Sequence, residues 1–274
     1  MRLACFEKDG RRSFGVISGD SVTDLGMAAA AGGPSFEDLL LKPSGPSSGG
    51  VFPLSAVKLL PPLANPASKV LALGWAYKSH QDETGHKADP FPFFFLKHAQ
   101  TLVGDRQPIV RPSISESYDF EGEFVVIIGK PGRHIPEDRA MEHVAGYSIL
   151  MDGSVRDWQK HSVTAGKNFD SSSSFGPWIV TRDEIADPHA LQLTTRLNGA
   201  VMQEVSTGQL AWSIAYLVHY CSTFTTLQPG DAISTGTPGG VGSKRNPPLW
   251  LQPGDRLEVE VSGVGILSNT VTQE

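Results

Sequence analysis

The sequence has few of the features that mark secreted, membrane or disulfide-rich proteins. Its 274 residues include only two cysteines, Cys5 and Cys221, which lie far apart and in no metal-finger spacing. Two distant cysteines form no disulfide framework, so we expect a cytoplasmic protein. No stretch approaches the roughly 20 apolar residues of a membrane helix, so we expect no membrane partner. The first ten residues are too charged for a signal peptide.

Basic blocks are also missing. The formal net charge is −6, so we expect no nucleic-acid partner. The chain is long enough to bury a large core, as one domain or as one domain with a small appendage. Its 29 glycines and 20 prolines are typical of a β-rich chain with many turns.

The N-terminal region is predicted to form a small antiparallel β domain. Turn signals separate three short strand patterns, at residues 2–7, 13–17 and 21–25. Residues 31–50 are rich in Gly, Ser and Pro and predict a surface linker, with a short helix at 35–41. Pro61, Pro62 and Pro66 mark the boundary with the main domain. We therefore predict a β domain with linker at 1–62 and a catalytic domain at 63–274.

An acidic pair precedes a predicted buried strand. Residues 124–128 are aromatic and β-branched and are followed by Gly129. Glu121 and Glu123 are two residues apart, so on a strand their side chains point to the same face. A divalent cation with oxygen ligands would stabilise two such carboxylates beside an apolar core. The alternative is a strand that enters from solvent with two exposed glutamates.

A third carboxylate follows the next predicted strand, residues 144–151. Asp152 comes directly after it, at a strand end, where loops commonly carry chemistry. Asp152-Gly153 is also an ordinary turn signal, and the position alone leaves that alternative open. Together with the two glutamates, Asp152 makes a candidate set of three oxygen ligands.

A histidine and a carboxylate are predicted to be neighbours on one short helix, residues 77–84. His80 and Glu83 are three residues apart and share a helix face. A carboxylate beside an imidazole fixes its tautomer and stabilises its charged form, which suits the activation of water. The alternative is a surface pair of little energetic consequence.

A lysine, a run of serines and a glycine-rich stretch are further features of interest. Lys97 follows an apolar strand at 92–96, where it would meet a substrate anion or else be an ordinary exposed lysine. The four serines at 171–174 predict a flexible loop. Residues 235–242 are glycine-rich backbone of the kind that binds anions, without the following helix of a nucleotide-binding motif.

The remaining patterns predict strands and two helices. A hairpin turn at Asn198-Gly199 follows a strand at 191–197, and three further strands are predicted at 232–234, 255–261 and 265–271. Residues 136–144 predict a helix. A second helix is predicted from one apolar stripe, formed by Leu210, Ile214, Leu217, Val218 and Cys221.

Seven short motifs, in order from about Val70 to the C-terminus, resemble the fumarylacetoacetate hydrolase family. They are GWAYKSHQDE (74–83), FLK (95–97), DFEGE (119–123), GY with D and RDWQ (146–159), KNFD (167–170), LNG with Gln203 and Thr207 (197–207), and PGD with TGTPGGVG (229–242). The resemblance implies a mixed, β-rich α/β fold with a β-barrel or β-roll catalytic domain, and a homodimer.

The resemblance also implies roles for individual residues. It implies that Glu121, Glu123 and Asp152 bind one Mg²⁺ or Mn²⁺ ion, and that His80 and Glu83 form a catalytic dyad on a mobile lid with its hinge at 84–89. Lys97 and Lys167 would act as catalytic cations, and the serines at 171–174 would lie near the pocket. Tyr77, Gln203 and Thr237 would bind the substrate, Thr237 through the substrate carboxylate. Met202 stands where the family often has Arg, which predicts a less anionic substrate tail.

The family resemblance favours an enzyme acting on a small 2-oxo or diketo acid. We expect metal-dependent hydrolysis of a C–C bond in an acylpyruvate-like compound, in which the metal stabilises the departing enolate. The same chemistry without an attacking water would support an oxaloacetate-like decarboxylase, a tautomerase or isomerase, or a hydratase. A non-catalytic, metal-stabilised binding protein is the least favoured alternative, because it would not need His80, Glu83 and Lys97 together.

Overall fold

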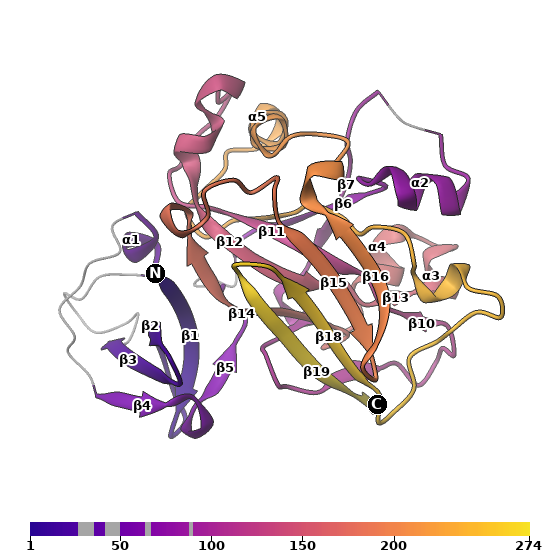
Figure 1. Cartoon of the computed structure of the whole chain (residues 1–274), viewed down its shortest axis with the longest axis horizontal. Helices are drawn as coiled ribbons and strands as arrows, with labels where there is room; N and C mark the ends of the chain where they lie inside the picture. The colour runs from indigo at the N-terminus through magenta and orange to yellow at the C-terminus, as the bar shows by residue number, and fades with distance from the viewer. Residues whose placement is uncertain (27–35, 42–49, 64–66, 88–89) are drawn as a thin grey trace.

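Twelve strands form one large, twisted sheet that carries both the N-terminal strands and the predicted ligand strands (Figure 1). The computed structural model describes residues 1–26, 36–41, 50–63, 67–87 and 90–274. The path through the large sheet is β4-β3-β2-β1-β14-β12-β11-β17-β6-β7, with β5 beside β1 and β8 beside β14. Its strands are β1 (Arg2–Lys8), β2 (Arg11–Ser18), β3 (Ser21–Gly26), β4 (Val51–Pro53), β5 (Lys58–Leu60), β6 (Val70–Gly74), β7 (Phe93–Lys97), β8 (Leu102–Val103), β11 (Gly122–Ile128), β12 (Val144–Met151), β14 (Ser173–Thr181) and β17 (Ala232–Ser234).

A five-stranded sheet packs against the middle of the large one, with β15 against β11, β18 against β12 and β19 against β14. Its order is β16-β15-β18-β19-β9, and its strands are β9 (Ile109–Arg111), β15 (Gln192–Leu197), β16 (Ala200–Ser206), β18 (Arg256–Val261) and β19 (Gly265–Gln273). Apolar side chains from the facing strands form the main core. The predicted β-rich fold class is confirmed. The strand path of the described residues has two ends, so it does not close into a barrel.

Short helices cover the ends of these sheets. The α-helices are α1 (Phe36–Leu41), α2 (Lys78–Thr84), α3 (Arg156–Gln159), α4 (Val163–Lys167) and α5 (Ile214–Phe224). The 3₁₀ helices are η1 (Leu54–Ala56), η2 (Ala99–Thr101), η3 (Glu137–His143), η4 (Arg182–Glu184), η5 (Thr207–Gln209) and η6 (Gly242–Lys244). A two-stranded ladder joins β10 (Tyr118–Asp119) to β13 (Ser154–Val155). Helices α2, α3 and α4 gather on one side of the molecule, on the right of Figure 1.

The N-terminal strands continue the large sheet. Strand β1 pairs with β14, and Leu3 lies opposite Ile179. Leu3 and Phe14 share a buried cluster with Phe175 and Ile179, so this unit contributes to a common core. The boundary at residue 62 stays a prediction. Most of the predicted linker at 31–50 lies outside the described residues.

Three local predictions are wrong in detail. Ser173 and Ser174 are buried and begin β14. Ser173 Oγ accepts the Gly153 N–H at 2.9 Å, and a short polar side chain satisfied in this way fits a buried strand, whereas Ser174 Oγ has no hydrogen-bond partner among the described residues. Helix α5 begins at Ile214, capped by Ser213 at 3.0 Å from the Tyr216 nitrogen, so Leu210 precedes it. The helix predicted at 136–144 is the 3₁₀ helix η3.

The register between β11 and β12 places the acidic residues. The strands are antiparallel, with Gly122 opposite Met151, and the Asp152 N–H donates to the Glu121 carbonyl at 2.8 Å. This pairing sets Asp152 beside Glu121 and Glu123, although 29 residues or more separate them in sequence. Gly122 is required here, because a Cβ atom would lie 2.1 Å from Thr195 Oγ1 on β15.

Candidate active site

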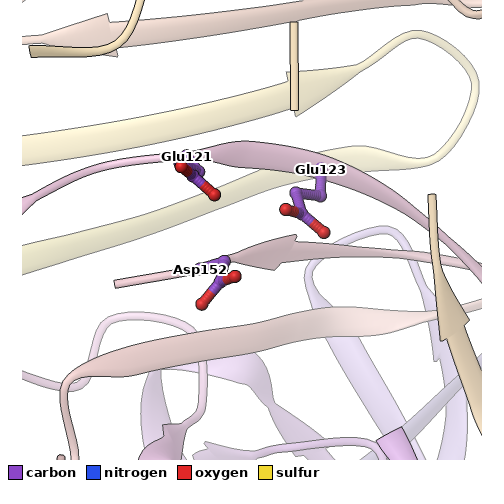
Figure 2. A group of neighbouring side chains, drawn as sticks. All are labelled: Glu121, Glu123 and Asp152. Atoms are coloured by element: carbon purple, nitrogen blue, oxygen red, sulfur yellow. The ribbon is translucent and has the colours of Figure 1, made fainter. Parts of the chain in front are cut away.

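Three buried carboxylates meet where β11 begins and β12 ends. Glu121, Glu123 and Asp152 each offer an oxygen within 4.8 Å of the others. Figure 2 shows Glu121 and Glu123 on one segment, with their side chains extending toward the neighbouring segment that carries Asp152. All three are at most 5% exposed, so water cannot screen their mutual repulsion. The exposed-strand alternative for the two glutamates is therefore excluded.

Two lysines neutralise part of this charge. Lys97 Nζ lies 2.6 Å from Asp152 Oδ1, and Lys167 Nζ lies 2.5 Å from Glu121 Oε2 and 2.7 Å from Asp152 Oδ2. Burial lowers the pKa of Lys97, although Asp152 opposes the shift. Burial also acts to lower the pKa of Lys167, but Asp152 and Glu121 outweigh it and raise that pKa. Both predicted catalytic cations thus contact the predicted metal ligands directly.

Neither of these lysines forms an ion pair with the third carboxylate, Glu123. Its Oε2 accepts the Ser234 hydroxyl, and its Oε1 has no hydrogen-bond partner among the described residues. Burial, together with repulsion from Asp152 and Glu121, raises the pKa of Glu123 well above its ordinary value. A divalent cation between the three carboxylates would satisfy Oε1 and remove the repulsion. The donor set therefore fits a hard, oxygen-loving metal ion.

Arg156 and Asp119 form an ion-pair network with the predicted metal ligand Glu121. Neither residue was assigned a role from the sequence. Arg156 Nη2 lies 2.7 Å from Glu121 Oε1, and its Nε lies 2.8 Å from Asp119 Oδ2. Burial acts to raise the pKa of Glu121, but Lys167 and Arg156 prevail and lower it to about 2. The alternation of Asp119, Glu121 and Glu123 at every second residue was the available signal.

The predicted dyad is present on α2. His80 Nδ1 lies 2.8 Å from Glu83 Oε1, and the Gly240 N–H donates to Glu83 Oε2 at 2.8 Å. The Gly239 N–H donates to Ser79 Oγ at 3.1 Å, so two backbone amides of the glycine-rich stretch bind α2. This arrangement fixes the orientation of the imidazole and leaves its Nε2 for proton transfer.

A cavity of about 580 Å³ opens beside the dyad and the triad. Its polar walls come from His80, Thr84, His86, Glu121, Arg156, Gln159, Lys167, Ser243 and Lys244, and the remaining walls from Leu73, Gly74, Trp75, Gly85, Phe93, Phe95, Val163 and Val241. Trp75 stacks on His86 with ring centroids 4.0 Å apart and has a positive φ of 53°. The cavity therefore joins a charged inner end to an aromatic wall.

The three predicted substrate contacts are buried behind this cavity. Gln203 Oε1 accepts the Gly122 N–H at 3.0 Å, and its Nε2 donates to Thr237 Oγ1 at 2.8 Å and to the Pro238 carbonyl at 3.0 Å. Thr237 in turn donates to the Gly122 carbonyl at 3.1 Å. Tyr77 has no exposed surface, and burial raises its pKa. In this structure Gln203 and Thr237 act as cross-links, and substrate contact by all three residues stays a prediction.

A buried acidic triad that could hold a metal ion, beside a cavity lined by a histidine paired with glutamate, is typical of a metal-dependent enzyme. The sequence profile described as "Fumarylacetoacetate (FAA) hydrolase C-terminal" matches residues 69–272. The chain belongs to this family, whose members are enzymes.

The relatives and structural neighbours differ in the reactions that they are named for. The chain is 40% identical over 225 residues to oxaloacetate tautomerase FAHD2A, mitochondrial, of Homo sapiens, covering 81% of this chain and 71% of that one. A fumarylacetoacetate hydrolase from Exiguobacterium antarcticum superposes with a TM-score of 0.85 at 34% identity, covering 100% of both chains. A 5-carboxymethyl-2-hydroxymuconate delta-isomerase from Mycobacterium smegmatis gives a TM-score of 0.81 at 34% identity, covering 100% of this chain and 99% of that one.

No helix among the described residues is long and apolar enough to cross a membrane. The cytoplasmic location stays a prediction, since the human relative is named as a mitochondrial protein.

We predict that Glu123→Gln removes metal binding without weakening the metal-free fold. Wild-type protein should gain about 2.7 kcal/mol of stability at a metal concentration 100 times Kd, because the ion binds only the folded chain. Thermal unfolding with Mg²⁺, with Mn²⁺ and with chelator measures that gain. Glu204→Gln on the exposed face of β16 is the matched control. An unchanged metal-dependent gain in Glu123→Gln would contradict the ligand assignment.

The two glutamates predict opposite pH slopes in metal-free protein. The pKa of Glu121 is lowered to about 2, so its contribution is present above its ordinary 4.5 and is lost as pH falls toward 2. The pKa of Glu123 is raised, so stability falls as pH rises above 4.5 and the unfolded chain ionises first. Denaturant unfolding should therefore show Glu123→Gln gaining on the wild type as pH rises from 4.5. A difference that stays constant with pH would sink the assignment.

Proposed function

We propose that the protein is a metal-dependent tautomerase of 2-oxo acids, with the keto and enol forms of an oxaloacetate-like diacid as its first candidate substrate. The observation that carries the proposal is that His80, which is paired with Glu83, lines the same cavity as Glu121. Tautomerisation needs one group that moves a proton between carbon and oxygen, and an environment that stabilises an enolate. The naming of the human relative supports this choice.

In this proposal the three carboxylates would bind the metal ion, and the His80–Glu83 pair would transfer the proton. Glu121, Glu123 and Asp152 would hold one Mg²⁺ or Mn²⁺ ion, which as a Lewis acid stabilises negative charge on the 2-oxo group. His80 Nε2 removes a proton from C3 of the keto acid and returns it to the oxygen of the enolate. Glu83 keeps the imidazole in one tautomer and stabilises its protonated form.

Hydrolysis of a C–C bond in an acylpyruvate is the second candidate. There His80 would take a proton from water, and the hydroxide would attack the distal carbonyl of the substrate. The bond between that carbon and C3 would then break, which releases a carboxylic acid and the enolate of pyruvate, and the enolate would take up a proton at C3. The same dyad serves both reactions, and the fumarylacetoacetate hydrolase among the structural neighbours favours keeping this alternative. Decarboxylation of oxaloacetate uses the same enolate without an attacking water.

We also propose a homodimer built on an exposed aromatic face. The face is formed by Phe91, Leu96 and Phe224, which are 60%, 50% and 51% exposed, together with Tyr220. Tyr220 contacts Phe91, Phe94 and Phe224 with ring centroids 6.0–6.4 Å apart. Strand β7 is at the end of the large sheet, beside this face. Covering it with a second copy would bury exposed apolar surface.

His80→Gln should lower kcat for tautomerisation by about 10²–10⁴-fold, the usual contribution of a general acid–base. The metal-dependent stabilisation should persist, because the three carboxylates are untouched. Stopped-flow absorbance of the oxaloacetate enol, with and without chelator, measures the rate. His98→Gln, an exposed histidine, is the control. Wild-type rates in His80→Gln would disprove the dyad; acylpyruvate cleavage without tautomerisation would favour the hydrolase.

Phe224→Glu should convert the dimer to a monomer, since it places a charge in the proposed apolar interface. Light scattering after gel filtration measures the mass of wild type and variant. Ile114→Glu, another exposed apolar position at 62%, serves as the control away from this face. A monomeric wild type, or a dimer that tolerates Phe224→Glu, would refute the interface.

A further inference from the structure

The cavity wall carries one cation that the site described above does not use. Lys244 lines the same cavity as His80 and Glu121. The other two strongly basic side chains of the wall, Lys167 and Arg156, are both paired with buried carboxylates. Lys244 Nζ has no ion pair or hydrogen bond with the rest of the described chain, and its side chain is exposed at the mouth.

The backbone that carries Lys244 is tied to the metal ligands. Helix η6 begins with Gly242 and Ser243, whose N–H groups donate to the two oxygens of Asp119 at 2.8 and 3.0 Å. Asp119 binds Arg156, and Arg156 binds Glu121. These contacts run without a break from the candidate metal site to helix η6. They therefore hold the backbone of Lys244 in a defined position relative to Glu121.

The residue after Lys244 fixes the other side of the turn. Arg245 Nη2 donates to the Met202 carbonyl at 2.8 Å and to the Gly240 carbonyl at 3.1 Å. Gly240 is also the residue whose N–H holds Glu83. Arg245 therefore binds the backbone next to Lys244 to both β16 and the glycine-rich stretch, while no such bond to a described residue holds the Lys244 side chain.

An unneutralised cation on the wall has a chemical consequence. In the cavity wall, Glu121 is the only carboxylate among the described residues, and Arg156 and Lys167 already neutralise it. The chain as a whole carries a net charge of −6, which repels anions in general. A positive charge at the mouth counters that repulsion for an anion which enters this cavity.

We propose that Lys244 binds the second carboxylate of the substrate, so that the site selects 2-oxo diacids over 2-oxo monoacids of equal length. This inference rests on the proposed function, which places the 2-oxo acid group at Glu121, Glu123 and Asp152. The far carboxylate of the same molecule then lies toward the mouth and accepts a hydrogen bond from Lys244 Nζ. Aromatic side chains such as Trp75 and Phe93 on the wall offer that carboxylate no comparable partner.

Matched ligand pairs test the proposal without requiring turnover. 2-Oxoglutarate and 2-oxopentanoate have five carbons each and differ in the terminal carboxylate; oxaloacetate and 2-oxobutanoate form the same pair at four carbons. Calorimetry with Mg²⁺-loaded protein measures the binding of the five-carbon pair, and KM or inhibition constants serve for the four-carbon pair. Oxalate, which has no tail, reports on the metal end alone.

The wild type should prefer the diacid of at least one pair by about ten-fold, the lower range for a charged hydrogen bond because Lys244 is exposed. Lys244→Met should remove that preference and leave oxalate binding unchanged, whereas Lys244→Arg should retain it. Lys58→Met, an exposed lysine on β5, controls for the change in net charge.

The outcomes separate the two proposals. A wild type that binds oxalate and both members of each pair equally overturns the role of Lys244 and leaves the proposed function standing. A diacid preference that survives in Lys244→Met does the same. A metal-loaded wild type that binds neither oxalate nor any 2-oxo acid overturns the proposed function, and with it this inference.

Discussion

The site depends on the repulsion between three carboxylates held out of water. Glu121, Glu123 and Asp152 cannot all remain ionised in a buried cluster unless cations balance them. Lys97 and Lys167 provide two such charges, and each is held by Asp152. All four oxygens of Glu121 and Asp152 already meet a cation, but a carboxylate has further lone pairs for a metal. The unpartnered oxygen of Glu123 then marks where positive charge is missing.

The same constraint explains the backbone around the site. The carboxylates are fixed by main-chain contacts, such as the Asp152 N–H on the Glu121 carbonyl. Gln203 holds Gly122, the residue between the two glutamates, and links it to Thr237 on the glycine-rich stretch. That stretch also binds Glu83 through Gly240. In this structure one loop thus contacts both the strand that holds the ligands and the helix that holds the base.

The parts of the site that depend on residues close together in sequence could be predicted from the sequence. Three features rest on short-range periodicity: the alternation of Glu121 and Glu123, the apolar strand that directly precedes Asp152, and the spacing of His80 and Glu83. Contacts set by sheet register were not predictable: nothing local indicates that Lys97 reaches Asp152, or that Leu3 pairs beside Ile179. The loop prediction for the serine run was wrong at Ser173 and Ser174, because sheet pairing with distant segments places them in a buried strand, where the distant Gly153 N–H donates to Ser173 Oγ.

The prediction for the substrate tail changes when the position of Met202 in the fold is considered. Met202, read alone, predicts a less anionic tail, because it replaces a family arginine. In the fold, the Met202 carbonyl instead binds Arg245, and the neighbouring Lys244 faces the cavity. A positive charge can thus be supplied from a different segment to the same region of the site. Since His80 and the three carboxylates would serve tautomerisation and hydrolysis alike, we infer that the choice between these reactions depends on the walls that select and orient the tail. Among the described residues of those walls, Lys244 is the lysine or arginine that no carboxylate neutralises, whereas Arg156 and Lys167 are both paired.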